Sequence, residues 1–131
     1  MKSKSFPNPT APAIKIACWN INGLFSKEQD KTTDNNFLDL IHKNDLIILT
    51  ETKCMPDEQI CIPNYYCFQL NRTPLKTAKT HSGGIAFLCK ENLKRGISIL
   101  QGKSEDFFWL KLNKNFFNIK LDLYICAVYD P

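Results

Sequence analysis

Polar side chains that could carry chemistry stand at the ends of several predicted strands in this sequence. Asn20 ends the first predicted strand, Glu51 ends the second and Tyr129 ends the last. His81 and the Gly83–Gly84 pair precede another strand. Because strand ends can meet at one edge of a sheet, these residues are candidates for a common site. Glu51 stands out, because a carboxylate that directly follows a buried strand is costly to desolvate unless it is paired or binds a cation.

The elements that would position these residues are predicted from hydrophobic periodicity. Residues 13–20 alternate between two sets of side chains with period two, which predicts a strand. A helix is expected over 32–43, where apolar residues recur at helical spacing behind a candidate N-cap, Thr33 or Asp34. Residues 45–50 form an almost continuous apolar run, as in a strand that is buried on both faces. The other predicted strands cover 65–70, 84–89, 97–100, 107–112 and 121–129.

The order of these elements indicates an α/β protein. A strand, a helix and a strand are followed by a run of strands, which favours a mixed or largely antiparallel sheet over a doubly wound parallel one. In the strand at 107–112, Phe108, Leu110 and Leu112 share one face. The glycines are scattered and form no phosphate-binding loop, which excludes nucleotide binding by such a loop, and no Ser or Cys lies in a nucleophile-elbow context.

Taken together, four segments of the sequence resemble the motifs of the endonuclease/exonuclease/phosphatase superfamily. Residues 16–24 (IACWNINGL) are similar to its first motif, and residues 49–53 (LTETK) are similar to its second. Residues 83–86 (GGIA) resemble its glycine-initiated core strand, and residues 127–131 (AVYDP) resemble its motif of an aromatic residue followed by proline. The greatest similarity is to the apurinic-site-like endonuclease domain of non-long-terminal-repeat, LINE-type retrotransposons. The resemblance implies a partial four-layer αββα sandwich of the DNase I-like type, with a mixed sheet.

The same resemblance implies a role for several residues. Glu51 would bind Mg²⁺, with Mn²⁺ as an alternative, because hard cations take oxygen ligands. Asn20 would form hydrogen bonds near the attacked phosphate, and Tyr129 would donate its hydroxyl to a phosphate oxygen. Repair-type members carry Asp where this sequence has Asn22, so the second metal ligand here keeps its oxygen but lacks its negative charge. The implied activity is nicking of DNA or cleavage of another phosphodiester.

The resemblance also implies catalytic residues that would follow Pro131. These are a later Asp-x-Asn pair, a C-terminal carboxylate and a Ser-Asp-His ending, which orient and deprotonate the attacking water. We therefore expect residues 13–131 to be the N-terminal half of such a domain, truncated at its C-terminus. Two alternatives stay open: an inactive remnant with at most weak nucleic-acid binding, and a phosphoesterase of the same superfamily that acts on a phosphoinositide or another small molecule.

Each candidate residue also has a purely structural interpretation. Asn20 precedes a loop with Gly23, and Asn is ordinary at such turns. Glu51 could be a surface charge beside Lys53. Tyr129 could be a strand aromatic residue with a hydrated hydroxyl.

A basic segment is the candidate for contact with nucleic acid. It contains Arg72, Lys76, Lys79 and His81, which could follow a phosphate backbone or form a solvated loop. The chain has 17 Lys and Arg against 13 Asp and Glu, a net charge of +4, which is only a mild preference for anionic partners.

The remaining features bound the class of protein. Residues 1–12 are polar and rich in Ser and Pro, contain no apolar signal-peptide core, and are expected to be a flexible leader. The apolar runs are of strand length, so we expect no transmembrane segment and an intracellular, cytoplasmic or nuclear location. The 6 cysteines are then expected to be reduced, with spacings unlike those of a zinc site. Half a sandwich would expose the inner face of its sheet, so we also expect marginal stability or self-association.

Overall fold

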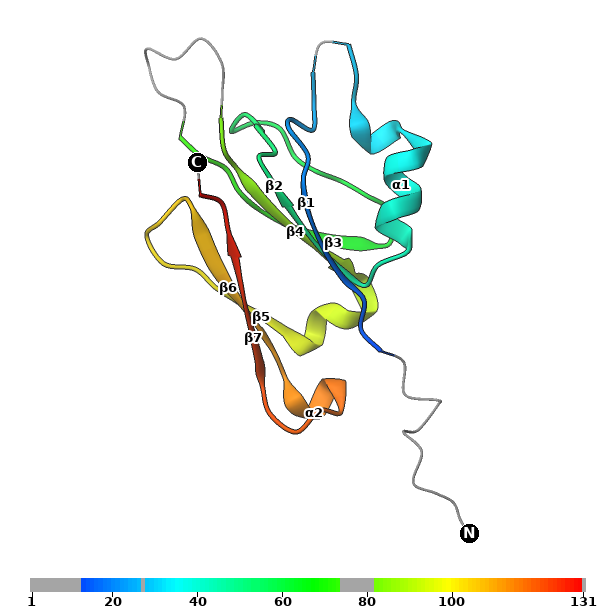
Figure 1. The fold of residues 1–131 in the computed structure, drawn as a ribbon, viewed down its shortest axis with the longest axis vertical. Coiled ribbons are helices and arrows are strands. Elements are labelled where there is room, and N and C mark those ends of the chain that lie inside the picture. Colours follow the sequence, from blue (N-terminus) through cyan, green and yellow to red (C-terminus); the bar gives the residue numbers. More distant parts are fainter. Residues whose placement is uncertain (1–12, 27, 74–81, 131) are drawn as a thin grey trace.

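Two β-sheets packed face to face form the centre of the computed structural model, which describes residues 13–26, 28–73 and 82–130 (Figure 1). The first sheet has the strand order β1-β2-β4-β3. Its members are β1 (Ile16–Asn20), β2 (Leu46–Thr50), β3 (Tyr65–Leu70) and β4 (Ile85–Lys90). β1 runs parallel to β2, whereas β4 is antiparallel to both of its neighbours, so the sheet is mixed as predicted.

The second sheet is an antiparallel meander with the order β5-β6-β7. It consists of β5 (Ile97–Leu100), β6 (Phe107–Leu112) and β7 (Leu123–Val128). The 3-10 helix η2 (Glu91–Gly96) leads from β4 into this sheet, and the short helix α2 (Lys114–Phe117) connects β6 with β7. The sequence did not reveal α2, because a single turn held by the Asn113 side chain at its N-cap carries no helical periodicity.

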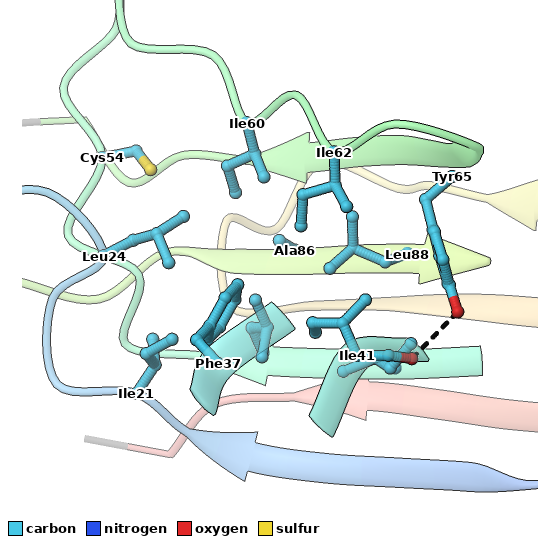
Figure 2. Close-up of a cluster of buried hydrophobic side chains, with 12 residues drawn as sticks. Ile21, Leu24, Phe37, Ile41, Cys54, Ile60, Ile62, Tyr65, Ala86 and Leu88 are labelled. Carbon is cyan, nitrogen blue, oxygen red and sulfur yellow. Dashed lines mark hydrogen bonds between the residues drawn. The ribbon is translucent and has the colours of Figure 1, made fainter. Parts of the chain in front are cut away.

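Helix α1 (Asn35–His42) covers the outer face of the first sheet, after the short 3-10 helix η1 (Lys31–Thr33). Asp34 is its N-cap, because the carboxylate accepts hydrogen bonds from the N–H groups of Asn36 (2.7 Å) and Phe37 (3.3 Å). Figure 2 shows Phe37 and Ile41 of α1 directed toward β4. The amphipathic pattern of 32–43 therefore places this helix on the sheet, as predicted.

An irregular segment after β2 completes the core between α1 and the first sheet. Cys54, Ile60 and Ile62 are buried in this core, although they belong to neither a helix nor a strand (Figure 2). The segment is held against β3 by Gln69, whose Oε1 accepts the Ile60 N–H at 2.6 Å. Gln69 Nε2 also donates to the Glu58 carbonyl at 3.0 Å, so one side chain of β3, an edge strand of the first sheet, holds the segment at two points.

A second core lies between the two sheets. Ile48 and Phe87 of the first sheet pack in the same cluster as Phe108, Leu110 and Leu112 of β6, which share one strand face as predicted. The expectation of an exposed inner sheet face is therefore wrong. The chain supplies its own second sheet, because β5, β6 and β7 fold over the first sheet and bury that face. β2 contributes to both cores, which confirms a strand buried on both faces.

The outer face of the second sheet has no covering layer in the described part of the chain. Alternation along the strands places Phe107 and Trp109 on this face, opposite Val128 and Cys126 of β7. Phe107 and Trp109 are 40% and 42% exposed. The described residues thus form a helix layer and two sheet layers, with the outermost face still apolar.

The two remaining expectations concern the N-terminal leader and membrane-spanning helices. The expected flexible leader, residues 1–12, lies outside them. Within the described ranges, the helices are all too short or too polar to cross a bilayer.

Candidate active site

The ends of the first sheet's strands bring the predicted polar residues together. The parallel pairing of β1 and β2 sets Asn20 opposite Thr50, so Glu51 follows directly beside it. β4 runs the other way and begins with Ile85 opposite Thr50, which places Gly84 at the same edge. Figure 1 shows the C-terminal ends of β1, β2 and β7 at one end of the molecule.

Backbone hydrogen bonds fix the segment that carries Glu51. The Gly23 N–H donates to the Glu51 carbonyl at 2.8 Å, and the Lys53 N–H donates to the Gly83 carbonyl at 2.8 Å. Residues 51–53 therefore lie between the loop after β1 and the entry to β4. The side chain of Thr52 is buried between them, so the positions of Glu51 and Lys53 are set by the core below.

Three residues at this edge have a left-handed backbone conformation. The φ angles are +50° at Asn22, +56° at Glu51 and +54° at Lys53. Such conformations are unfavourable for residues with a β-carbon and persist where the surrounding structure imposes them. Their gathering at one edge marks a segment whose backbone is arranged to present particular side chains.

These side chains form a connected group, the strand-end cluster, which consists of Asn20, Asn22, Glu51 and Lys53. The Lys53 ammonium donates to Asn22 Oδ1 at 2.8 Å and lies 3.8 Å from Glu51 Oε1. Asn20 Oδ1 accepts the Asn22 N–H at 3.1 Å, which ties the end of β1 to the loop that follows. Glu51 and Lys53 are partly exposed, so the cluster can be reached from solvent.

The cluster has the donor chemistry of a site for a hard cation. Glu51 offers carboxylate oxygens and Asn22 an amide oxygen, and a positive group, the Lys53 ammonium, already lies against both. Oxygen ligands of this kind suit Mg²⁺, which typically takes one or two carboxylates and completes its shell with water and phosphate. Among the described residues no group of three or more His, Cys, Asp or Glu side chains is close enough to hold a metal. A divalent ion would therefore depend on Glu51 as its carboxylate ligand, with Asn22 beside it.

Tyr129 reaches the same end of the molecule from the second sheet. Its N–H donates to the Asp106 carbonyl at 2.9 Å, and the Arg72 guanidinium lies 5.7 Å from the centre of its ring. Arg72 in turn pairs with the Asp106 carboxylate at 2.5 Å and passes over Gly83, where a β-carbon would be 3.0 Å from Arg72 Cδ. Because Gly83 binds the Lys53 N–H, these contacts connect Tyr129 with the strand-end cluster.

The basic segment is only partly described. Arg72 lies at its start, and its guanidinium is paired with Asp106, so contact with a phosphate would require it to share or leave that partner. Lys76, Lys79 and His81 lie outside the described residues. Their predicted contact with nucleic acid stays a prediction.

Two residues of the site were not among the predicted ones. Lys53 was missed because the left-handed backbone at Glu51 and Lys53, which brings their side chains together, leaves no periodic pattern in the sequence. Asp106 could not be predicted from the sequence. It precedes β6 of the second sheet, whereas its partner Arg72 follows β3 of the first sheet. The nearby Cys54 is not a nucleophile, because burial raises the pKa of its thiol to about 11 and keeps it protonated at neutral pH.

Comparison with known protein families decides the family. The model of the Endonuclease/Exonuclease/phosphatase family matches residues 17–127. The chain belongs to this family. The match begins within β1 and ends within β7, so the family's pattern includes both sheets and the strand-end cluster. A search of curated protein sequences found none similar to this chain.

Two solved structures are similar to this chain. The AP endonuclease LMAP from Leishmania major superposes with a TM-score of 0.61 at 16% sequence identity, over 88% of this chain and 40% of that one. The 3′ phosphatase NExo (D146N) from Neisseria, bound to a product DNA hairpin, gives a TM-score of 0.46 at 14% identity, over 89% of this chain and 41% of that one. The likeness to LMAP confirms the predicted DNase I-like fold, and the chain spans about two fifths of the length of these two structures.

Proposed function

We propose that this chain carries part of a metal-dependent phosphodiesterase site that nicks strands of nucleic acid. The observation that carries the proposal is the strand-end cluster. It brings the oxygens of Asn22 and Glu51 to one edge of the sheet, around a positive group, with Asn20 beside them. Membership in the family supports a phosphoester substrate.

Each residue has a defined task in this proposal. Glu51 and Asn22 would hold Mg²⁺ or Mn²⁺, which when bound supplies polarisation of the phosphoryl oxygen and stabilises the leaving oxygen. Asn20 would form hydrogen bonds beside the attacked phosphate. Tyr129 would donate its hydroxyl to a phosphate oxygen, a contact that strengthens as negative charge develops there. Arg72 orients Tyr129 through Asp106 and the contact with its ring.

We further propose that the chain derives from a retrotransposon and holds only part of the active site. The similarity of the four motifs to the endonuclease domain of LINE-type retrotransposons supports an origin in such an element, and Asn22 stands where repair-type members carry Asp. The chain spans about two fifths of the length of LMAP, so residues that orient the attacking water are expected to be needed in addition. A second candidate function follows from the same fact, namely binding of nucleic acid without cleavage.

A plasmid assay tests the proposal. Supercoiled plasmid would be incubated with the 131-residue chain in Mg²⁺ or in chelator, alongside Glu51→Gln. Glu91→Gln is the matched control, because Glu91 is an exposed carboxylate on the connection after β4, away from the strand-end cluster. Nicking that needs Mg²⁺ and is lost only in Glu51→Gln supports the endonuclease.

The other outcomes separate the alternatives. Salt-sensitive binding of DNA with no nicking supports the binding-only function, because phosphate contacts weaken as counterions accumulate. Release of phosphate from a soluble phosphoester, with the plasmid intact, supports a small-molecule phosphoesterase. Nicking that is equal in chelator and in Glu51→Gln would contradict the role of Glu51.

A further inference from the structure

We propose that Lys53 is a positioning residue that competes with a divalent cation for the oxygens of Asn22 and Glu51. In this proposal the ammonium holds both side chains in place while no divalent ion is bound, and it leaves Asn22 when an ion binds. Lys53 thereby sets the affinity of the site for metal. The inference rests on the proposed function, because it assumes that Glu51 and Asn22 are the ligands.

The geometry places the ammonium where a cation would bind. Its 2.8 Å hydrogen bond to Asn22 Oδ1 uses an oxygen that a metal would need, and Glu51 Oε1 is 3.8 Å away. The stem of Lys53 passes over Gly23, where a β-carbon would lie 3.5 Å from Lys53 Cδ. The Lys53 stem therefore lies at van der Waals distance from the loop after β1 as it extends toward Asn22.

The Lys53 ammonium can move while the Lys53 backbone stays fixed. The Lys53 N–H is bound to the Gly83 carbonyl at 2.8 Å, and the neighbouring Thr52 is buried. The side chain itself is 33% exposed and has rotatable bonds that can carry the ammonium into solvent. Displacement thus needs only a change of rotamer, without rearrangement of the sheet.

The charges explain why the competition matters. The negative charge of Glu51 is cancelled by the positive charge of Lys53, and Asn22 is neutral. The three side chains together therefore carry no net charge. A divalent ion would approach a group with no net charge and would repel the ammonium. Unit charges a few ångströms apart interact strongly enough, even with partial screening by water, to change an affinity by about tenfold or more.

Direct measurement of Mn²⁺ binding tests this role without relying on activity. The 131-residue chain would be titrated with Mn²⁺ while electron paramagnetic resonance follows the free ion. Lys53→Met removes the charge and leaves an unbranched side chain that is one atom shorter, and Lys53→Arg keeps the charge. Lys111→Met is the matched control, because Lys111 pairs with Asp122 at 3.7 Å on the second sheet and is 36% exposed, close to the 3.8 Å and 33% of Lys53.

The expected result is a Kd for Mn²⁺ about tenfold lower in Lys53→Met than in the unmodified chain, with Lys53→Arg and Lys111→Met unchanged. Circular dichroism of each variant checks that the fold is retained. Equal or weaker binding in Lys53→Met, with loss of binding in Glu51→Gln, would overturn the competition and leave the proposed metal site standing. Absence of saturable Mn²⁺ binding in every variant would overturn the proposed metal site and this inference together.

Discussion

Replacement of Gly84 by alanine should destabilise the fold more than the same replacement at Gly83. Both glycines have left-handed backbone, with φ of +93° and +78°. They differ in what an added β-carbon would meet. At Gly83 it would lie 3.0 Å from the end of the flexible Arg72 side chain, whereas at Gly84 it would clash with Thr52 Oγ1, which is buried in the core.

The expected loss of stability is the sum of a backbone cost and a packing cost. An unfavourable φ costs about 1–3 kcal/mol for a residue with a β-carbon, and this term applies to both positions. Overpacking of a well-packed core adds about 1–3 kcal/mol, and we expect it in full only at Gly84. Gly84→Ala should therefore lower the free energy of unfolding by about 2–6 kcal/mol, a large part of the roughly 5–15 kcal/mol typical of native proteins.

Urea unfolding followed by circular dichroism measures both costs, with the slope of the transition as a check on two-state behaviour. A double-mutant cycle with Thr52→Ala isolates the clash. Removal of Oγ1 should recover about 1–3 kcal/mol of the cost of Gly84→Ala and little of that of Gly83→Ala. If the two glycine variants are equally destabilised, or if Thr52→Ala recovers nothing, then contact with Thr52 does not explain the glycine.

Two further predictions concern other parts of the fold. Burial opposes the ionisation of Asp45, yet the Lys15 N–H (2.8 Å) and the Lys90 ammonium (3.0 Å) hold the pKa of this carboxyl below its usual value. Its stabilising contribution is therefore complete above about pH 4 and is lost as the pH falls through the lower folded-state pKa, so Asp45→Asn should cost about 1 kcal/mol at pH 7 and less in acid, by urea titration at several pH values. On the outer face of the second sheet, Trp109→Lys should reduce concentration-dependent association in sedimentation velocity, because it places a charge on an exposed apolar face. Leu121→Lys, at a 76% exposed leucine outside the strands, is the control, and a monodisperse unmodified chain would contradict this prediction.

Much of the fold could be predicted from the sequence, because local periodicity reports burial. The uninterrupted apolar run at 45–50 reflects β2, which is packed on both faces. The alternation at 107–112 reflects β6, whose inward side chains are fully buried while Phe107 and Trp109 are exposed. Asp34 was one of the two candidate N-caps because its side chain can bind the free N–H groups of a first helical turn.

The approach of Asn20 to Glu51 could also be expected from the sequence. Asn20 ends β1 and Glu51 directly follows β2, and the strand–helix–strand order favours strands that run in the same direction, so both residues lie at the same edge of the sheet. The clustering of left-handed backbone at Glu51 and Lys53 could not be expected in the same way. It arises from hydrogen bonds with the loop after β1 and with the entry to β4, which are distant in the sequence.

The sequence by itself determined which segments are strands, which faces of them are apolar, and which polar residues stand at strand ends. Only the tertiary structure decided that β5, β6 and β7 cover the inner face of the first sheet, that the Lys53 ammonium lies on Asn22, and that Arg72 pairs with Asp106. The physical reason is that periodicity records how much of each residue is buried, whereas the partner of a side chain depends on strand order and register between distant segments.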